Sequence, residues 1–561
     1  MATSRVAAAV CFLLDCALVA FVALSVAILV TGGFVIDVGS LRIRGRTLTN
    51  PVVIAAALLV GRYFLRTQLP FLGLRSLRLD DIGRDGLSWT GRLIHEGMPV
   101  RRILASLILL AVVVKLAAAW HLPGFFSGDD VEVHEMTLSA LFGADWPIWE
   151  LRSPFFPLAF VYPAQWLAHS AGITDSRSLV FAGRAVVALL STLVIPLTYI
   201  AARRVAPTTP AVGVIAVALV TANKLQMSFG STELPRPVAS VFVLGAFILL
   251  LSRRTSHGAF AGILLGGAAA FRFSEAMFVL PALVMLRERR RWLEAGVMLI
   301  ATAATSALVI GMADLLYWGT PFASVVKAVE YTLIQDQSSR GYEPFFQYLL
   351  LLPQWTNWFV FALAIAGSIR CRTVAAWLWL PVLMLSALPH KETRYLIPVI
   401  PYLCIAAGIG VHGVIHDART VWPPARAYAA GALLLPLLLL GLLQDMGGWR
   451  LARSNDEVVL AHRLAHEESG GIAIRGAWRL GGRIFLGSRH HFIEIEDASL
   501  ATPETRRQLF RGARWIVVDP ETAKRLHHAE ITALGFELDD SWTNPWHRLY
   551  TKPRAGGRVA P

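Results

Sequence analysis

The chain has 561 residues, of which 55% are hydrophobic and 16% charged, and its mean hydropathy is +0.55. Soluble domains carry roughly a quarter charged residues, so the composition excludes a protein that is soluble throughout. The formal net charge is +14, and 46 of the 52 basic residues are arginine. No other feature supports nucleic acid as a partner. Arginine between apolar segments is typical of cytoplasmic loops and of phosphate binding, so we expect a bilayer and an anionic lipid group as partners.

Apolar runs recur along the first 446 residues. A helix needs about 20 apolar residues to cross a bilayer, and several of these runs are shorter. The pattern predicts an α-helical polytopic membrane protein with about thirteen transmembrane helices. The runs are 6–30, 48–65, 103–120, 179–202, 211–222, 238–251, 258–271, 275–286, 292–316, 344–369, 374–388, 395–415 and 427–443.

The distribution of arginine predicts the orientation. Arginines gather in 66–102, 203–204, 253–254, 287–291 and 370–372, and such loops face the cytoplasm. If 155–170, interrupted by Pro157 and Pro163, returns without crossing, the C-terminus lies outside. Segments 122–177, 223–237, 272–274, 317–343 and 390–394 are then external too, and we expect the active site on this extracytoplasmic face. The preference for arginine over lysine favours a bacterial inner membrane, with the ER membrane as the eukaryotic equivalent.

Three domains are predicted. Residues 1–102 form an N-terminal unit of two membrane helices and a basic cytoplasmic loop, and residues 103–446 form the membrane catalytic domain with the external loop 122–177. Residues 447–561 are more charged and contain short β-like runs at 471–474, 492–495 and 515–518. They predict a small extracytoplasmic α/β domain, which could serve as a lid, an acceptor-binding module or a stabilising cap.

The external loop opens with an acidic cluster at 129–135 that includes Asp129, Asp130, Glu135 and His134. One interpretation is a solvated turn that caps a helix. The other is a catalytic base, because neighbouring carboxylates shift one another's pKa. A metal site or a glycosidase-like pair of carboxylates is less specific. Further oxygen ligands for a metal are not evident, so we expect neither a metal nor a cofactor.

The same loop continues with tryptophans beside Glu150 and Arg152. Tryptophans at a membrane boundary are usually interface anchors. They also stack on the apolar faces of sugars, while Glu150 and Arg152 could bind hydroxyls or a phosphate.

A third signal lies between two apolar runs, where His390, Lys391, Glu392 and Arg394 stand within five positions. Lone charges here would be interpreted as side chains that snorkel to the interface. The three cations together are suited to a lipid phosphate that leaves during a reaction.

The segment from His390 to Tyr395 resembles the HKE-x-R-[FY] motif of GT-C mannosyltransferases, which use dolichyl-phosphate mannose in GPI-anchor and N-glycan precursor assembly. Asp129–Asp130, Glu135 and Trp149–Glu150 follow the order of acidic residues in an early lumenal loop of that family, and 314–321 is similar to a further family stretch. The similarity covers roughly 103–443 and implies the GT-C fold.

The resemblance implies an inverting transfer of a hexose, first of all mannose, from a polyprenyl-phosphate sugar to a glycan or glycolipid acceptor. Asp129, or else Asp130, would be the base. The substrate-binding residues would be Glu135, Glu150, Arg152, His390, Lys391, Glu392 and Arg394.

Two alternatives remain open. One is another GT-C enzyme with a different lipid-phosphate sugar. The other is a transporter or flippase of lipid-linked sugars, for which Arg272 and Glu275, ionisable residues at membrane depth, are the one indication.

Overall fold

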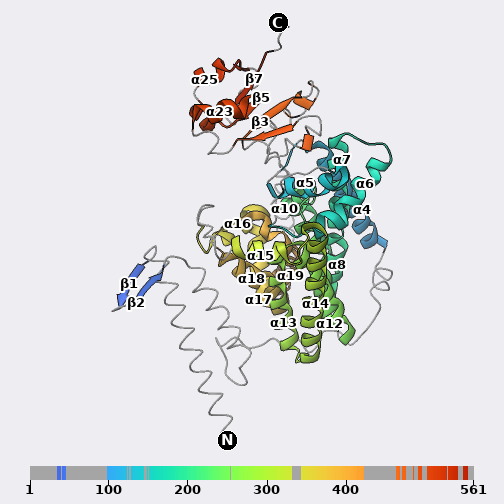
Figure 1. Ribbon diagram of the computed structural model, residues 1–561. Helices are drawn as coiled ribbons and strands as arrows, with labels where there is room; N and C mark the ends of the chain where they lie inside the picture. Colours follow the sequence, from blue (N-terminus) through green and yellow to red (C-terminus); the bar gives the residue numbers. More distant parts are fainter. Residues whose placement is uncertain are drawn as a thin grey trace.

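The computed structural model describes the backbone of 34–38 and 41–45, most of 98–331, residues 343–421 except 389, and parts of 461–553. Within 98–331 the gaps are 123, 126–127, 144–147, 149–150 and 253. The described residues form a helical body with a small sheet domain at one end (Figure 1). Strands β1 (Phe34–Val38) and β2 (Leu41–Gly45) form an antiparallel pair that the sequence analysis did not predict. The predicted helices at 6–30, 48–65 and 427–443 lie outside the described residues.

The first half of the helical body contains helices at the predicted apolar runs and, in addition, helices at 128–142 and 224–229, which no apolar run predicted. Its elements are α4 (Met98–His121), α5 (Gly128–Phe142), η1 (Pro157–Val161), α6 (Tyr162–Ser170), α7 (Ser176–Thr192), α8 (Val194–Val205), α9 (Pro210–Ala222), α10 (Lys224–Phe229), α11 (Arg236–Leu251) and α12 (Thr255–Phe271).

The second half begins with the 3₁₀ helix η2 and contains α14, the longest of the described helices. Its elements are η2 (Phe273–Phe278), α13 (Val279–Glu288), α14 (Trp292–Trp318), α15 (Ala323–Val329), α16 (Gln347–Thr356), α17 (Trp358–Arg370), α18 (Arg372–Ser386), η5 (Thr393–Val399) and α19 (Ile400–Val421).

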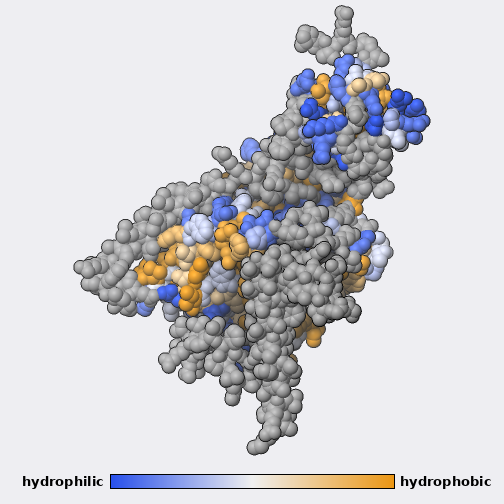
Figure 2. Space-filling model, turned by 90° about the vertical axis from the view of Figure 1, so that its left-hand side faces the viewer, coloured by the Kyte–Doolittle hydropathy of each residue, from blue (hydrophilic) through white to orange (hydrophobic). Residues whose placement is uncertain are grey.

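Four spans of the described residues are long and apolar enough to cross a membrane, and a bent pair of helices could add a fifth. Four shorter apolar helices accompany them, and the total of about thirteen crossings remains a prediction. Leu293, Ile300 and Leu316 on α14 are 73%, 72% and 78% exposed, as expected for side chains that face lipid. Apolar residues lie on the surface of the helical body, whereas hydrophilic ones gather on the sheet domain (Figure 2). The four spans are Val100–His121, Ser176–Val205, Trp292–Trp318 and Thr393–His416.

The predicted run at 344–369 is not one continuous helix. It consists of α16 and α17, which meet at an angle of 115°. Pro353 lies inside α16, and Asn357 between the helices has a φ of 93°. Asparagine tolerates positive φ better than most residues, and the Asn357 side chain accepts a hydrogen bond from the backbone N–H of Phe359 at 2.8 Å. The break is therefore encoded by a residue that both permits the turn and caps α17.

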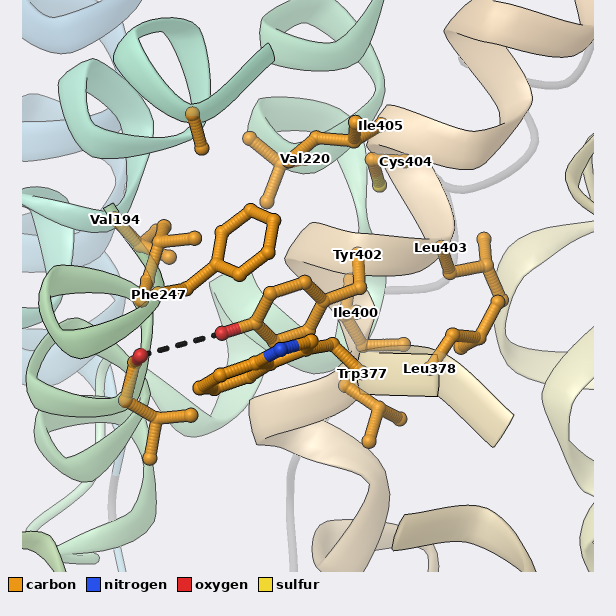
Figure 3. Close-up of a cluster of buried hydrophobic side chains, with 14 of the residues drawn as sticks. Val194, Val220, Phe247, Trp377, Leu378, Ile400, Tyr402, Leu403, Cys404 and Ile405 are labelled. Carbon is orange, nitrogen blue, oxygen red and sulfur yellow. Dashed lines mark hydrogen bonds between the residues drawn. The ribbon is translucent and has the colours of Figure 1, made fainter. Parts of the chain in front are cut away.

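Aromatic side chains fill the centre of the helical body. Phe247 of α11, Trp377 of α18 and Tyr402 of α19 lie with ring centroids 5.1–5.4 Å apart (Figure 3). The hydroxyl of Tyr402 donates to the backbone carbonyl of Val243 at 3.3 Å, which satisfies a polar atom that is otherwise costly in an apolar core. The cluster thus holds α11 against α18 and α19, which lie far later in the sequence.

The C-terminal domain contains a five-stranded sheet in the order β4-β3-β5-β7-β6. The three predicted strands are confirmed as β3, β4 and β5, with β3 parallel to both neighbours, and β7 is antiparallel to β5 and β6. Helices α23 (Pro503–Phe510), α24 (Pro520–Arg525) and α25 (His528–Ala533) complete the predicted α/β domain. The strands are β3 (Gly471–Ile474), β4 (His491–Glu494), β5 (Ala513–Val518), β6 (Glu537–Leu538) and β7 (Arg548–Thr551).

The two faces of the sheet contact different partners. Ile472, Trp515 and Val517 share a buried cluster with Val131 of α5 and Leu179 of α7. The alternate residues of the same strands pack with α23 and α25 in a separate cluster. Because side chains alternate across a strand, the sheet has one face on its own helices and one face on the helical body.

Candidate active site

The acidic cluster lies at the start of α5, where Asp129 and Asp130 occupy the first turn. Acidic residues are favourable there because the N-terminus of a helix carries partial positive charge. The interpretation as a solvated turn is nevertheless wrong, because Asp129 is 8% and Asp130 0% exposed. Buried carboxylates need strong partners to remain ionised, and the structure supplies them to Asp129.

Three arginines from separate segments converge on the Asp129 carboxylate. Arg152, between α5 and η1, donates to Oδ1. Arg272, the residue that ends α12, donates to Oδ2 at 2.8 Å, and Arg394 of η5 lies 3.0 Å from the same oxygen. The structure thus brings the predicted acidic loop into contact with the HKE-x-R segment, as expected if both belong to one active site.

A second layer of acids holds these arginines. Glu392 accepts from Nε of Arg394 and from Nε2 of His390, the latter at 2.9 Å. Glu132 accepts from Nε of Arg152. The hydroxyl of Tyr348 is 3.2 Å from the backbone nitrogen of Glu392, which donates to it. Each arginine on Asp129 is therefore oriented by more than one contact, apart from Arg272, whose position follows from the end of α12.

The electrostatics separate the acids of the cluster. Burial by itself raises the pKa of Asp129, but the charges of Arg152, Arg272 and Arg394 outweigh burial and hold that pKa well below its usual range. Burial raises the pKa of Glu132, helped by the charge of Asp129 and opposed by Arg152. Partial burial also acts to raise the pKa of Glu392, yet Arg394 and His390 outweigh it and lower that pKa. Neighbouring carboxylates with divergent pKa values are typical of catalytic sites.

The remaining predicted residues take other positions. Nζ of Lys391 donates to the backbone carbonyls of Leu388 and Glu343 at 2.6 and 3.0 Å, and burial lowers its pKa. Glu135 is buried further along α5, with 3% exposure. Glu150 lies outside the described residues. Of the predicted cations, Arg394 and Arg152 contact Asp129 directly. His390 contacts Glu392, which in turn contacts Arg394. Lys391 donates to backbone carbonyls.

Arg272 and Glu275, the two residues that gave the one indication of a transporter, each pair with a different residue. Arg272 pairs with Asp129, whereas Glu275 accepts from Arg236 at 2.8 Å. The start of η2 separates the two side chains, because Arg272 has an extended backbone and Glu275 is already within the 3₁₀ helix. The contact with Asp129 places Arg272 in the candidate active site, and Glu132 belongs to it because it holds Arg152. The signal for Arg272 was present in the sequence as a charge at the end of an apolar run.

A second buried ionic cluster lies behind α5. Glu233 pairs with Arg184 of α7 at 2.7 Å and lies 3.7 Å from Nε2 of His134, whose Nδ1 is 2.8 Å from the side-chain nitrogen of Gln165. Burial lowers the pKa of His134. Burial acts to raise the pKa of Glu233, but the positive charge and the hydrogen bond of Arg184 oppose burial, and that pKa is lowered. Among the described residues, Nε2 of His134 and Oε1 of Gln165 have no hydrogen-bond partner. Each of these side chains nevertheless has a partner within the fold through another atom, so we assign the cluster to structure.

The chemistry available at Asp129 follows from its partners. Guanidinium groups bind phosphate through paired hydrogen bonds, and an ionised carboxylate accepts a proton. Among the described residues, no group of three or more His, Cys, Asp or Glu side chains is arranged to hold a metal ion. The site therefore combines an acceptor of protons with a cluster of anion-binding cations.

The sequence model of the Alg9-like mannosyltransferase family matches residues 134–447. A Dol-P-Man:Man(7)GlcNAc(2)-PP-Dol alpha-1,6-mannosyltransferase of Drosophila melanogaster is 28% identical over 211 residues. Those residues are 36% of this chain and 31% of the fly protein, so the match spans about a third of that relative.

The fold is similar to solved structures. ArnT from Cupriavidus metallidurans in the apo state has a TM-score of 0.58 and 15% identity, with 81% of this chain and 98% of ArnT covered. ArnT bound to undecaprenyl phosphate has a TM-score of 0.56 and 14% identity, with 80% and 98% covered. These similarities confirm the GT-C fold of a helical membrane protein. The family model covers more than half of the sequence, from His134 in α5 through the HKE-x-R segment. The chain belongs to the Alg9-like mannosyltransferase family.

Proposed function

We propose that the chain is an inverting glycosyltransferase that moves a hexose, specifically mannose, from a polyprenyl-phosphate sugar to a hydroxyl of a glycan or glycolipid acceptor. The observation that carries the proposal is the ionised carboxylate of Asp129 among three guanidinium groups. Family membership and the name of the fly relative support mannose. The undecaprenyl phosphate bound to ArnT supports a polyprenyl phosphate as the carrier.

In the proposed reaction the acceptor oxygen attacks the anomeric carbon of the sugar on the face opposite the phosphate. Asp129 takes the hydroxyl proton, the bond between the anomeric carbon and the phosphate oxygen breaks, and its electron pair stays on the polyprenyl phosphate. A single attack of this kind inverts the anomeric configuration. The departing phosphate gains negative charge, and cations placed to bind that charge lower the barrier.

The proposal gives each predicted residue a role. Asp129 is the base, with Asp130 as the alternative, and Arg394 with His390 and Lys391 holds the phosphate. Glu392 orients Arg394 and His390 through the contacts described above. Arg272 joins the phosphate-binding set because of its contact with Asp129. The residues proposed to orient sugar hydroxyls are Glu135, Glu150 and Arg152.

The side of the membrane and the division into domains belong to the same proposal. The arginine-rich loops support an extracytoplasmic site, in an inner membrane or its ER equivalent. We assign residues 1–102 to an N-terminal membrane unit, 103–446 to the catalytic domain and 447–561 to an extracytoplasmic α/β domain. Donor, acceptor and bilayer are the proposed partners, with no nucleic acid.

The test is the transfer of radiolabelled mannose from synthetic polyprenyl-phosphate mannose by the purified full chain, with a membrane lipid extract as acceptor. We expect label in a new product, and we expect Asp129→Asn to reduce the rate by about 10²- to 10⁴-fold, the usual contribution of a general base. The matched control is Glu330→Gln, a carboxylate on the surface with 43% side-chain exposure. Wild-type turnover from an Asp129→Asn, Asp130→Asn double variant would refute the assignment of the base.

The same assay separates the alternatives. Label transferred from another polyprenyl-phosphate sugar, but not from the mannose donor, would indicate a GT-C enzyme of different sugar specificity. Movement of the donor across liposomes without a product would indicate a transporter.

A further inference from the structure

The ion pairs of Asp129 conflict with the roles proposed for its partners, because the same arginines would have to contact the base and bind the leaving phosphate. Arg272 and Arg394 both contact Oδ2 of Asp129, at 2.8 and 3.0 Å. In an inverting transfer the base and the leaving phosphate lie on opposite sides of the anomeric carbon. The sugar must fit between them, so cations in direct contact with the base cannot hold the leaving phosphate at the same time. The described arrangement is therefore a state that donor binding has to change.

The charges around Asp129 indicate which contacts can change. Asp129 shares α5 with Glu132, which pairs with Arg152. Three arginines from other segments contact Asp129 itself, namely Arg152, Arg272 and Arg394. Glu392 in turn pairs with Arg394. Arg152 and Arg394 each have a second carboxylate that holds them through Nε. Arg394 contacts Asp129 through a different nitrogen, Nη1, so this contact can change while Glu392 still holds Nε. Arg272 follows the last turn of α12 in an extended conformation and donates to Asp129. It can turn toward a phosphate without breaking another ion pair given above.

We propose that the donor phosphate takes Arg272 and Arg394 away from Asp129, so that this carboxylate becomes an effective base only when the lipid-linked sugar is bound. The inference rests on the proposed function and adds regulation of the same site by its own substrate. Asp129 with both oxygens occupied by guanidinium groups is a weak proton acceptor, because hydrogen bonds and positive charge stabilise its ionised form. Once two of these partners bind the phosphate instead, the acceptor hydroxyl can donate to Oδ2.

The same competition favours release of the product. After transfer the polyprenyl phosphate no longer carries the sugar, and Asp129 loses its proton to solvent. The free carboxylate then competes with the product phosphate for Arg272 and Arg394. In this cycle Asp129 acts first as the base and afterwards as the group that recovers the cations, and Arg272 acts as a positioning residue that passes between two anions.

The first experiment measures binding of undecaprenyl phosphate to the full chain in detergent, with no transfer required. We expect Asp129→Asn to bind at least about tenfold more tightly than wild type, because a neutral amide no longer competes for the guanidinium groups; tenfold corresponds to about 1.4 kcal/mol, within the range of one charge-assisted hydrogen bond. Equal or weaker binding by a folded Asp129→Asn variant overturns the proposal.

The matched control is Glu294→Gln, which removes a buried carboxylate that pairs with an arginine, Arg291, outside the candidate active site. Because Arg291 is not among the arginines on Asp129, we expect less than about a threefold change in affinity. A gain as large as that of Asp129→Asn would mean that any lost negative charge improves binding, and would overturn the competition.

The second experiment measures single-turnover transfer against pH, so that product release does not enter. The profile at low donor concentration reflects the free enzyme, and the profile at saturating donor reflects the complex. We expect the acid limb at saturation to lie at least about one pH unit higher, since Asp129 has then lost two cationic partners. Coincident acid limbs overturn the activation of the base.

Arg272→Gln provides a variant that leaves Asp129 in place. We expect this variant to bind undecaprenyl phosphate about tenfold more weakly than wild type. Its acid limb at low donor concentration should lie closer to the acid limb measured at saturating donor. Arg272→Lys should restore part of the binding. An unchanged acid limb contradicts the proposal. Failure of the proposed function has a different signature, because tight binding by Asp129→Asn would persist while no sugar is transferred.

Discussion

Asp129, Glu233 and Glu275 each pair with an arginine that lies far away in the sequence. Charges buried in this way are costly to remove from water, and the cost is compensated only by close partners. Asp129 differs from the other two because three arginines share it, and because its neighbours include an acid with a raised pKa, Glu132. Local charge patterns indicated which residues matter, whereas the pairing depended on the fold.

A variant in the buried cluster behind α5 measures what such a pair contributes. We expect Glu233→Gln to lower the free energy of unfolding by about 3–5 kcal/mol, because Arg184 would be left buried without its carboxylate. Thermal unfolding of the detergent-solubilised protein is the measurement. Glu330→Gln, in an exposed pair with Lys327, should change stability little. Similar melting temperatures for both variants would contradict the structural role of Glu233.

At the scale of elements, close contacts between helices depend on glycine. Gly258, Gly262 and Gly266 follow one another at intervals of four on α12 and face α14. A Cβ at Gly262 would lie 2.4 Å from the carbonyl oxygen of Met298, and one at Gly266 would lie 2.7 Å from that of Thr302. In membranes, small residues at this spacing let helix backbones approach closely. The spacing is visible in the sequence, but its partner helix is not.

We expect Gly262→Ala to destabilise the protein by about 1–3 kcal/mol, since α12 and α14 must separate to admit the methyl group. The control is Gly296→Ala on α14, where an added Cβ would meet nothing within 4 Å. Unfolding in detergent compares the two variants. If Gly262→Ala were as stable as wild type, the described separation of α12 and α14 would be wrong.

At the scale of the whole molecule, the sheet domain lies against the helix that carries Asp129 (Figure 1). Phe485 of this domain packs against Phe125, with ring centroids 5.7 Å apart, and Phe125 is fully buried beside His134. The opposite face of the sheet packs on its own helices through residues such as Phe536. The contact therefore supports α5 from the side of the sheet domain, which favours a stabilising cap among the roles considered for residues 447–561.

We expect Phe485→Ala to increase amide hydrogen exchange in α5, because a buried aromatic contact supports that helix. Mass spectrometry of peptides from 128–142 is the measurement, and it requires no knowledge of the substrate. Phe536→Ala should increase exchange within the sheet domain and leave α5 close to wild type. Unchanged exchange in α5 for Phe485→Ala would show that the domain does not support the site.

The sequence alone determined most of the elements and the motifs. Apolar runs predicted most of the described helices of the helical body, though not α5, α10 or α15, and short β-like runs predicted β3 to β5. The acidic loop and the HKE-x-R segment predicted both halves of the candidate site. These features depend on hydropathy and on the chemistry of neighbouring residues, which a short stretch of sequence contains. Tertiary structure decided the rest: the bend at Asn357, the sheet domain against α5, and the pairing of Arg272 with Asp129 and of Glu275 with Arg236. A buried charge pairs with whichever opposite charge the packing of the helices brings within reach, and that proximity arises only when distant segments fold together.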